Sequence, residues 1–329
     1  MRACIAGLLL LLLPHSASAY LELSSDVRGQ TVPLRWATTT PVRWYVTDRG
    51  VPGISVADVQ SAIAKAFATW QAVPTSAIAF EFAGFTNAEP FDDDDVSTLG
   101  FQSHPEMERV LGATGFVVDE LTGDIIESDV FFNSAFPWSV NASADASAFD
   151  LQSTATHEIG HFLGLGHSAL GETELRPDGG RRVIASGAVM FPISFGRGRI
   201  DDRQLQRDDI VGASNIYPEA TFRSRTGAIR GRVLHAGRPV FGAHVLAFNP
   251  DTGDVVGSFS LDAQGSFQIA GLTPGAYVVR VEPLDDADVE SFFDTPNVDV
   301  NFAVTFYPQL VVVPAGGVGQ DIEVSLRSK

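Results

Sequence analysis

The stretch His157-Glu158-Ile159-Gly160-His161-Phe162-Leu163-Gly164-Leu165-Gly166-His167 decides how the rest of the chain is interpreted. His157 and His161 are four residues apart, so on a helix they project from one face and can bind one metal ion together. Glu158 lies beside them, where its carboxylate can take a proton from a water that the ion activates. The pattern therefore predicts a helix that carries a zinc site.

Two glycines in the same stretch make a third histidine available. Gly164 and Gly166 weaken the helix and permit positive φ, which lets the chain turn and bring His167 back to the same ion. Three histidine ligands leave the fourth tetrahedral position open, which is typical of a catalytic zinc, whereas a structural site is closed by four protein ligands. A core helix with satisfied histidines is the alternative, and the long H-E-x-x-H-x-x-G-x-x-H pattern disfavours it.

The whole string resembles that of the metzincin metallopeptidases, and its surroundings are most similar to the matrixin branch. Residues 188–192, Ala-Val-Met-Phe-Pro, resemble the Met-turn, in which Met190 would form an apolar floor beneath the ligands. Ser168 follows the last histidine, as in matrixins, and Pro192 stands where astacins and serralysins carry a metal-binding Tyr. Residues 205–217 resemble the last helix of a matrixin catalytic domain.

The resemblance implies an activity and a set of ligands. The chain would be a zinc-dependent endopeptidase, with one Zn²⁺ held by His157, His161 and His167. Glu158 would be the general base that takes a proton from the attacking water and passes it to the leaving amine. The catalytic domain, residues 34–220, would have an α+β fold with a mixed twisted sheet and about three helices.

The resemblance also implies how a protein or peptide substrate would bind. A strand within residues 113–118 would pair with the extended substrate. Pro192 and Ser194 would lie at the wall of the pocket for the residue after the cut bond, with Ser194 in place of the usual Tyr. The span from His167 to Met190 is longer than in most matrixins, and we expect a surface excursion near the cleft.

The N-terminus reads as a secretory signal peptide of residues 1–19. Arg2 precedes a leucine run at 8–13, and Ala17-Ser18-Ala19 matches an A-x-A cleavage site, so we expect cleavage after Ala19. No second long apolar run follows, which predicts a secreted protein, extracellular or periplasmic, without a membrane anchor. Cys4, the only cysteine, would be removed, so the mature chain would lack disulfides and the thiol-to-zinc latency switch of many matrixins.

The acidic charge of the chain limits the classes of molecule that it is expected to bind. The chain of 329 residues has 22 basic and 40 acidic residues, a formal net charge of −18, which argues against nucleic acid or an anionic membrane as a partner. Its length suits two domains with separate cores. Nothing in the sequence fixes the oligomeric state.

Local patterns predict the elements of the catalytic domain. Residues 20–33 form a segment too short to fold alone. Ser55 with Asp58 resembles a capping box at the start of a helix over 56–71, and Asp150 would cap the zinc helix. Strands are expected at 41–46, 78–82, 113–118 and 125–133.

The same domain contains residues that suggest two further metal sites. The run of Asp92 to Asp95 could bind Ca²⁺ through hard carboxylate oxygens, but a solvated loop is the favoured interpretation. Matrixins hold a second, structural zinc with a histidine at the place of Ile126. His104 is the other histidine of this domain, and we expect it in a surface loop rather than at a zinc.

Residues 226–329 change to short alternating segments separated by Gly, Pro, Asn and Asp, which predicts an all-β antiparallel sandwich. Parts of it resemble the carboxypeptidase regulatory-like domain of transthyretin type. His235 and His244 are expected to be structural or solvated, and the domain to stabilise the protein or tether substrate. Seven strands are expected, at 231–235, 243–249, 255–260, 266–269, 276–282, 304–307 and 322–326.

Two other functions fit parts of the sequence. A non-catalytic secreted binding or adhesion protein would keep the fold with a degenerate peptidase site, but the intact Glu158 and the full set of histidines count against it. A zinc hydrolase of non-protein amides would use the same activated water, and the residues leave this alternative open.

Overall fold

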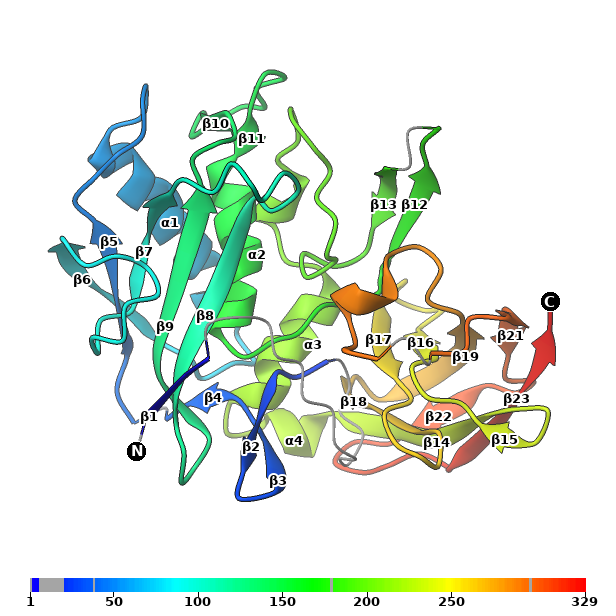
Figure 1. Ribbon diagram of the computed structural model, residues 1–329. Helices are drawn as coiled ribbons and strands as arrows, with labels where there is room; N and C mark the ends of the chain where they lie inside the picture. The colour runs from blue at the N-terminus through cyan, green and yellow to red at the C-terminus, as the bar shows by residue number, and fades with distance from the viewer. Residues whose placement is uncertain (1, 6–20, 38, 178–179, 296–297) are drawn as a thin grey trace.

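The computed structural model describes residues 2–5, 21–37, 39–177, 180–295 and 298–329. The expected signal peptide and its cleavage point lie outside these ranges, except that residues 2–5 form strand β1 (Arg2–Ile5). An α+β unit and a β sandwich lie side by side (Figure 1). Within the described ranges, no helix has the length and apolar character needed to cross a membrane.

The N-terminal unit is built on the predicted mixed sheet, whose strand order is β1-β8-β9-β7-β5-β6. Its central pairs are parallel, and β8 runs antiparallel to β9. Strands β1, β4 and β7 of this sheet were not expected, and β6 lies a few residues after its expected position. The bounds are β4 Arg35–Trp36, which pairs with β9, β5 Val42–Thr47, β6 Phe80–Thr86, β7 Thr98–Gln102, β8 Gly112–Asp119 and β9 Asp124–Asn133.

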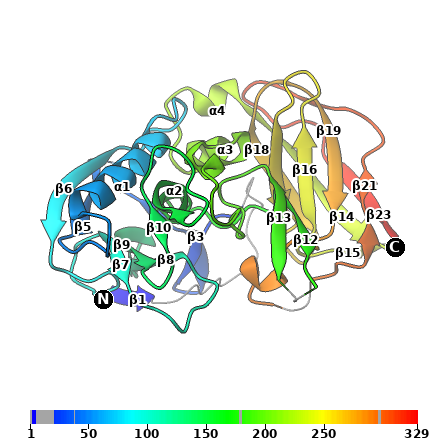
Figure 2. The ribbon, with the colours of Figure 1, turned by 90° about the horizontal axis from the view of Figure 1, so that it is seen from above.

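Helices α1 (Val56–Gln71) and α2 (Leu151–Phe162) pack together beside this sheet (Figure 2). The predicted cap of α1 is confirmed, because the Ser55 hydroxyl oxygen accepts a hydrogen bond from the backbone N–H of Asp58 at 3.2 Å. The indole of Trp70, fully buried, donates to the carbonyl of Thr156 at 2.8 Å, which ties the two helices together.

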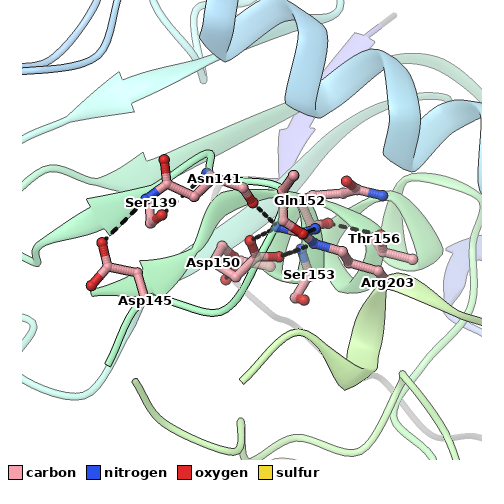
Figure 3. Close-up of polar contacts among 10 residues, drawn as sticks. Ser139, Asn141, Asp145, Asp150, Gln152, Ser153, Thr156 and Arg203 are labelled. Atoms are coloured by element: carbon pink, nitrogen blue, oxygen red, sulfur yellow. Dashed lines mark hydrogen bonds and ion pairs between the residues drawn. The ribbon is translucent and has the colours of Figure 1, made fainter. Parts of the chain in front are cut away.

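The start of α2 is fixed by the predicted cap, Asp150. Its Oδ1 accepts the backbone N–H of Ser153 at 2.7 Å, an interaction that contributes about 1 kcal/mol to helix stability. Figure 3 shows Arg203 directed at the same carboxylate, with which it forms a buried ion pair. Arg203 ends the short helix η1 (Asp201–Arg203) and also donates to the carbonyl of Asn141 at 2.6 Å. The zinc-motif helix is therefore held at its first turn by Arg203 of the short helix η1.

The C-terminal unit is all-β, as expected, with two five-stranded sheets, but it is not wholly antiparallel, which corrects that part of the prediction. Strands β14 and β23 pair in parallel. No hairpin joins them, so the path of the strands between them sets their direction. The bounds are β14 Gly227–His235, β15 Arg238–Pro239, β16 His244–Phe248, β17 Val255–Phe259, β18 Ser266–Leu272, β19 Gly275–Glu282, β20 Phe302–Ala303, β21 Thr305–Phe306, β22 Val311–Val313 and β23 Ile322–Ser328.

The excursion between His167 and Met190 is a hairpin of β12 (Gly171–Leu175) and β13 (Arg181–Ser186), which lies beside the C-terminal unit in both ribbon views (Figures 1 and 2). Helices α3 (Arg207–Ile216) and α4 (Phe222–Arg225) lead into that unit. One hydrophobic cluster takes side chains from both units, among them Leu21, Ala169, Phe191, Phe259, Phe292 and Phe293. The two units therefore share a core.

The N-terminal segment, too short to fold alone, packs into the N-terminal unit. Residues 24–33 form a hairpin of β2 (Ser24–Val27) and β3 (Gln30–Pro33), and Leu21 and Leu23 are buried. The segment is thus part of the folded unit.

Candidate metal centre

The three histidines of the motif converge on one point. Ligand atoms of His157, His161 and His167 all lie within 4.8 Å of one another, and the Nε2 atoms of His161 and His167 are 3.2 Å apart. Two nitrogens bound tetrahedrally to one zinc would lie about 3.3 Å apart, given the usual zinc-to-nitrogen length. In the described part of the chain, no other group of three His, Cys, Asp or Glu side chains comes this close.

Backbone carbonyls orient all three imidazoles. A carbonyl oxygen only accepts, so each Nδ1 carries the proton and each Nε2 directs its lone pair at the shared centre. Burial lowers the pKa of all three rings, and that of His167 to about 3, so they are neutral near pH 7. This donor set fits a zinc ion. The Nδ1-to-oxygen distances are 2.7 Å for His157 to Val189, 2.8 Å for His161 to Leu165 and 2.6 Å for His167 to Ser291.

The turn that returns His167 rests on the N-terminal segment. Gly164 has a φ of +96°, as expected, but Gly166 does not have positive φ, which corrects the prediction for this residue. Gly166 is needed for space instead, because a Cβ there would lie 2.8 Å from the carbonyl oxygen of Leu21. The N–H of Gly166 donates to that same oxygen at 2.6 Å, and the N–H of Leu23 donates to the carbonyl of Gly164 at 2.8 Å.

Glu158 belongs to the zinc-motif helix, and its side chain contacts strand β8 of the sheet. Its side chain is buried, which raises the pKa of the carboxyl to about 7, while a hydrogen bond from Thr114 opposes the rise. The Thr114 hydroxyl lies 2.8 Å from Oε2 of Glu158. Sequence reasoning missed Thr114, although it placed the residue in the strand beside the cleft, because no pattern fixes which side chains of β8 meet α2.

Strand β8, predicted to pair with substrate, has a free edge over half of its length. Within the described residues, β1 pairs only with Phe116–Asp119, so residues 112–115 have a neighbouring strand on the β9 side alone. Thr114 lies in this open part. Among the residues that the structure describes, the edge of the sheet beside Glu158 therefore has no strand paired to it.

Met190, whose role in a Met-turn stays a prediction, packs against the zinc-motif helix. Met190 is buried, and its sulfur lies against Gly160 of α2, where a Cβ would overlap it. The buried carboxylate of Asp209, on α3, accepts the backbone N–H groups of Val189 at 2.9 Å and Met190 at 3.2 Å. Asp209 was not predicted as part of the site, although two adjacent acidic residues in the first turn of α3 were a signal for it.

Pro192 and Ser194 follow the Met-turn and stay predictions as pocket residues. Pro192 is half-buried, and Ser194 is exposed with its hydroxyl oxygen accepting the N–H of Gly196 at 3.3 Å. Their neighbours Ile193 and Phe195 pack against the cluster shared with the C-terminal unit. The segment after Met190 is thus bordered by that unit.

Three further histidines among the described residues, His104, His235 and His244, have hydrogen-bond partners outside this centre. His104, half-buried in a loop, contacts Glu106 at 3.1 Å and Gln102 at 3.2 Å. His235 lies 2.8 Å from a carboxylate oxygen of Asp299, and His244 3.0 Å from one of Glu282. These contacts agree with the structural roles predicted for the two strand histidines.

The acidic run lies over two buried carboxylates of β9. Asp92 to Asp95 are exposed, and the N–H groups of Asp94 and Asp95 donate to the Glu127 carboxylate. Asp129 accepts from Thr98 at 2.7 Å and from Phe91. Burial raises the pKa of Glu127 to about 7 and that of Asp129 to about 8.

The raised pKa values of Glu127 and Asp129 imply that the folded protein loses stability as the pH rises. In the unfolded chain these carboxyl groups have pKa values near 4. Between about pH 4 and 8 the folded chain therefore binds more protons than the unfolded chain. The free energy of unfolding then falls as the pH rises, on the order of 1 kcal/mol per pH unit for each group. We expect the free energy of unfolding in urea to fall less between pH 5.5 and 8 in Glu127→Gln than in the wild type.

The exposed Glu81→Gln on β6 is the matched control and should keep the wild-type slope. Equal slopes in Glu127→Gln and the wild type would contradict the prediction. Calcium added at pH 8 separates the two interpretations of the acidic run: restored stability would show that these carboxylates bind Ca²⁺, and an unchanged value would support the solvated loop.

Comparisons with known proteins match one family in the N-terminal part of the chain and another in the C-terminal part. Residues 35–177 match the matrixin family, and residues 228–305 match the carboxypeptidase regulatory-like domain. Metalloendoproteinase 1 of Glycine max is 33% identical over 48% of this chain and 45% of its own length. Metalloendoproteinase 2-MMP of Arabidopsis thaliana is 29% identical over 49% of this chain and 37% of its own length.

The interstitial collagenase of Oryctolagus cuniculus is 29% identical over 56% of this chain and 33% of its own length. The chain therefore spans about a third to a half of these relatives. Among solved structures, "The Bacillus anthracis TIE protein" aligns with a TM-score of 0.21 and 12% identity over 32% of this chain and 17% of that chain, which carries no argument.

Proposed function

The chain contains a matrixin domain followed by a carboxypeptidase regulatory-like domain, and from this premise we propose that it is a secreted zinc-dependent endopeptidase. The observation that carries the proposal is the set of three Nε2 atoms that converge while every Nδ1 is held by a carbonyl. An open fourth position on such an ion suits catalysis. The expected signal peptide supports an extracellular or periplasmic location.

His157, His161 and His167 would hold the ion, and Met190 would support them from below. A zinc bound there would supply Lewis acidity, polarising the peptide carbonyl and making water a better nucleophile. Glu158 takes a proton from the attacking water and delivers it to the leaving amine nitrogen. Thr114 orients that carboxylate through the 2.8 Å hydrogen bond.

The substrate would bind as an extended peptide along residues 112–115 of β8. Antiparallel pairing there supplies main-chain hydrogen bonds and places a peptide carbonyl beside Glu158. Pro192 and Ser194 would border the pocket for the residue after the cut bond. A protein or peptide is thus the proposed substrate.

The test is cleavage of an unfolded, fluorescently labelled protein by the purified chain, with bound zinc determined on the same sample. We expect about one zinc per chain and cleavage that a chelator abolishes and added zinc restores. Cleavage that persists after the metal is removed would overturn the proposal. Zinc bound without cleavage of any member of a peptide library would favour an amide hydrolase of other substrates, and a folded sample with neither zinc nor cleavage would favour a binding protein.

A further inference from the structure

The third histidine is oriented by the C-terminal unit. The Nδ1 of His167 donates to the carbonyl oxygen of Ser291 at 2.6 Å, across 124 residues of sequence. Ser291 ends the short helix η2 (Val289–Ser291), in the loop that follows β19. The corresponding carbonyls for His157 and His161 belong to Val189 and to Leu165 in the turn after α2, so among the three only the His167 partner is supplied by the other unit.

The loop that carries Ser291 is anchored on both sides. Phe292, fully buried, has its ring 6.2 Å from the His167 ring and 5.7 Å from that of Phe259 on β17. On the other side, the β12–β13 hairpin holds the loop. The N–H and hydroxyl of Thr173 donate to Asp286 at 3.1 and 2.6 Å, and Arg181 donates to the carbonyl of Asp285 at 3.0 Å.

A buried carboxylate makes a second link to the same place. Asp208, on α3, accepts the hydroxyl of Ser168 at 2.6 Å through one oxygen and the N–H of Gly257 at 2.8 Å through the other. Ser168 follows His167 directly, and Gly257 belongs to β17 of the sandwich. Breaking this link would leave a buried carboxylate with an unmet hydrogen bond, which costs about 1 to 3 kcal/mol.

We propose that the carboxypeptidase regulatory-like domain is a built-in part of the metal centre, in which the Ser291 carbonyl positions His167 for the ion. The partner that orients an imidazole fixes its tautomer and its direction. Displacing the loop would free the His167 ring to rotate, so the metal would bind more weakly although its three ligands remain. This role goes beyond the expected stabilising or tethering one, and it rests on the proposed zinc site.

Two adjacent phenylalanines give a matched test in the full chain. Phe292 and Phe293 are both fully buried in the same cluster, but Phe293 packs on Phe241 and Phe259, 5.1 and 5.5 Å away. Leucine at either position should lower thermal stability by similar amounts. Phe292→Leu should also weaken zinc binding about tenfold in competition with a chromophoric chelator, whereas Phe293→Leu should stay within twofold of the wild type.

The hairpin offers a second pair, the half-buried Arg181 and the exposed Arg182, and urea unfolding of both variants reports any change in stability. Arg181 reaches Asp285 and Asp288 of the loop, while Arg182 pairs with Glu174 within the hairpin at 2.8 Å. Arg181→Ala should weaken zinc binding about threefold, and Arg182→Ala should leave it unchanged. The absorption spectrum of bound Co²⁺ reports the ligand geometry directly, and it should change in Phe292→Leu and Arg181→Ala only.

The outcomes separate this inference from the proposed function. Equal zinc affinities and equal Co²⁺ spectra within both pairs would overturn the inference, even if the wild type cleaves protein. A selective loss in Phe292→Leu and Arg181→Ala would establish it even if no peptide is cleaved, because metal binding is measured without turnover. A wild type that binds no zinc would overturn both.

Discussion

Replacing Glu158 by glutamine should leave zinc binding and folding intact and lower kcat about 10³-fold. The amide has nearly the same shape, and its oxygen can still accept the Thr114 hydrogen bond of 2.8 Å. It cannot take a proton, however, and general acid–base catalysis contributes about 10² to 10⁴ to such rates. The loss should fall on kcat rather than on KM, because Glu158 acts on the proton and not on substrate affinity.

The measurement is steady-state cleavage of the labelled protein, with zinc content and urea unfolding determined for both samples. Zinc near one per chain in the variant would show that the histidines are undisturbed. A variant that retains most of the wild-type turnover would exclude Glu158 as the general base. Equal loss of zinc and turnover would mean that the substitution disturbed the metal site, and Glu158→Asp would then be compared under the same conditions.

Replacing Gly164 by alanine should destabilise the fold by about 3 kcal/mol and displace His167. Alanine at a φ of +96° is strained by about 1 to 2 kcal/mol. Its Cβ would also overlap the carbonyl oxygen of Leu34, which belongs to backbone and cannot rotate away, and such crowding adds about 1 to 3 kcal/mol. Zinc affinity should fall with stability, because this turn returns the third histidine.

Gly253 gives the matched control, since it has a φ of +80° and open space around its Cβ position. Gly253→Ala should lose only about 1 kcal/mol, which isolates the backbone strain. Both variants and the wild type are unfolded in urea with a chelator present, so that bound metal does not add to the stability. Similar losses in the two alanine variants would show that the contact with Leu34 relaxes without cost.

Local signals in the sequence determined much of the fold. Periodicity and capping residues placed α1 and the start of α2, because Ser55 and Asp150 act on N–H groups three residues away. Alternating segments indicated most strands of the sandwich. The spacing of the three histidines predicted that they converge. One helical turn brings His157 and His161 together, and the glycine turn brings His167 to them, all within eleven residues.

Contacts between distant segments decided the rest. Pairing across a sheet does not leave a local pattern, so β7 and the parallel pair of β14 with β23 were missed. The surroundings of the histidines come from chain far away: Leu21 supports the glycine turn, Thr114 contacts Glu158, and Ser291 orients His167. The sequence by itself thus predicted which three histidines converge. Only the tertiary structure decided what orients them, because a backbone carbonyl can come from any residue type and packing brings it there.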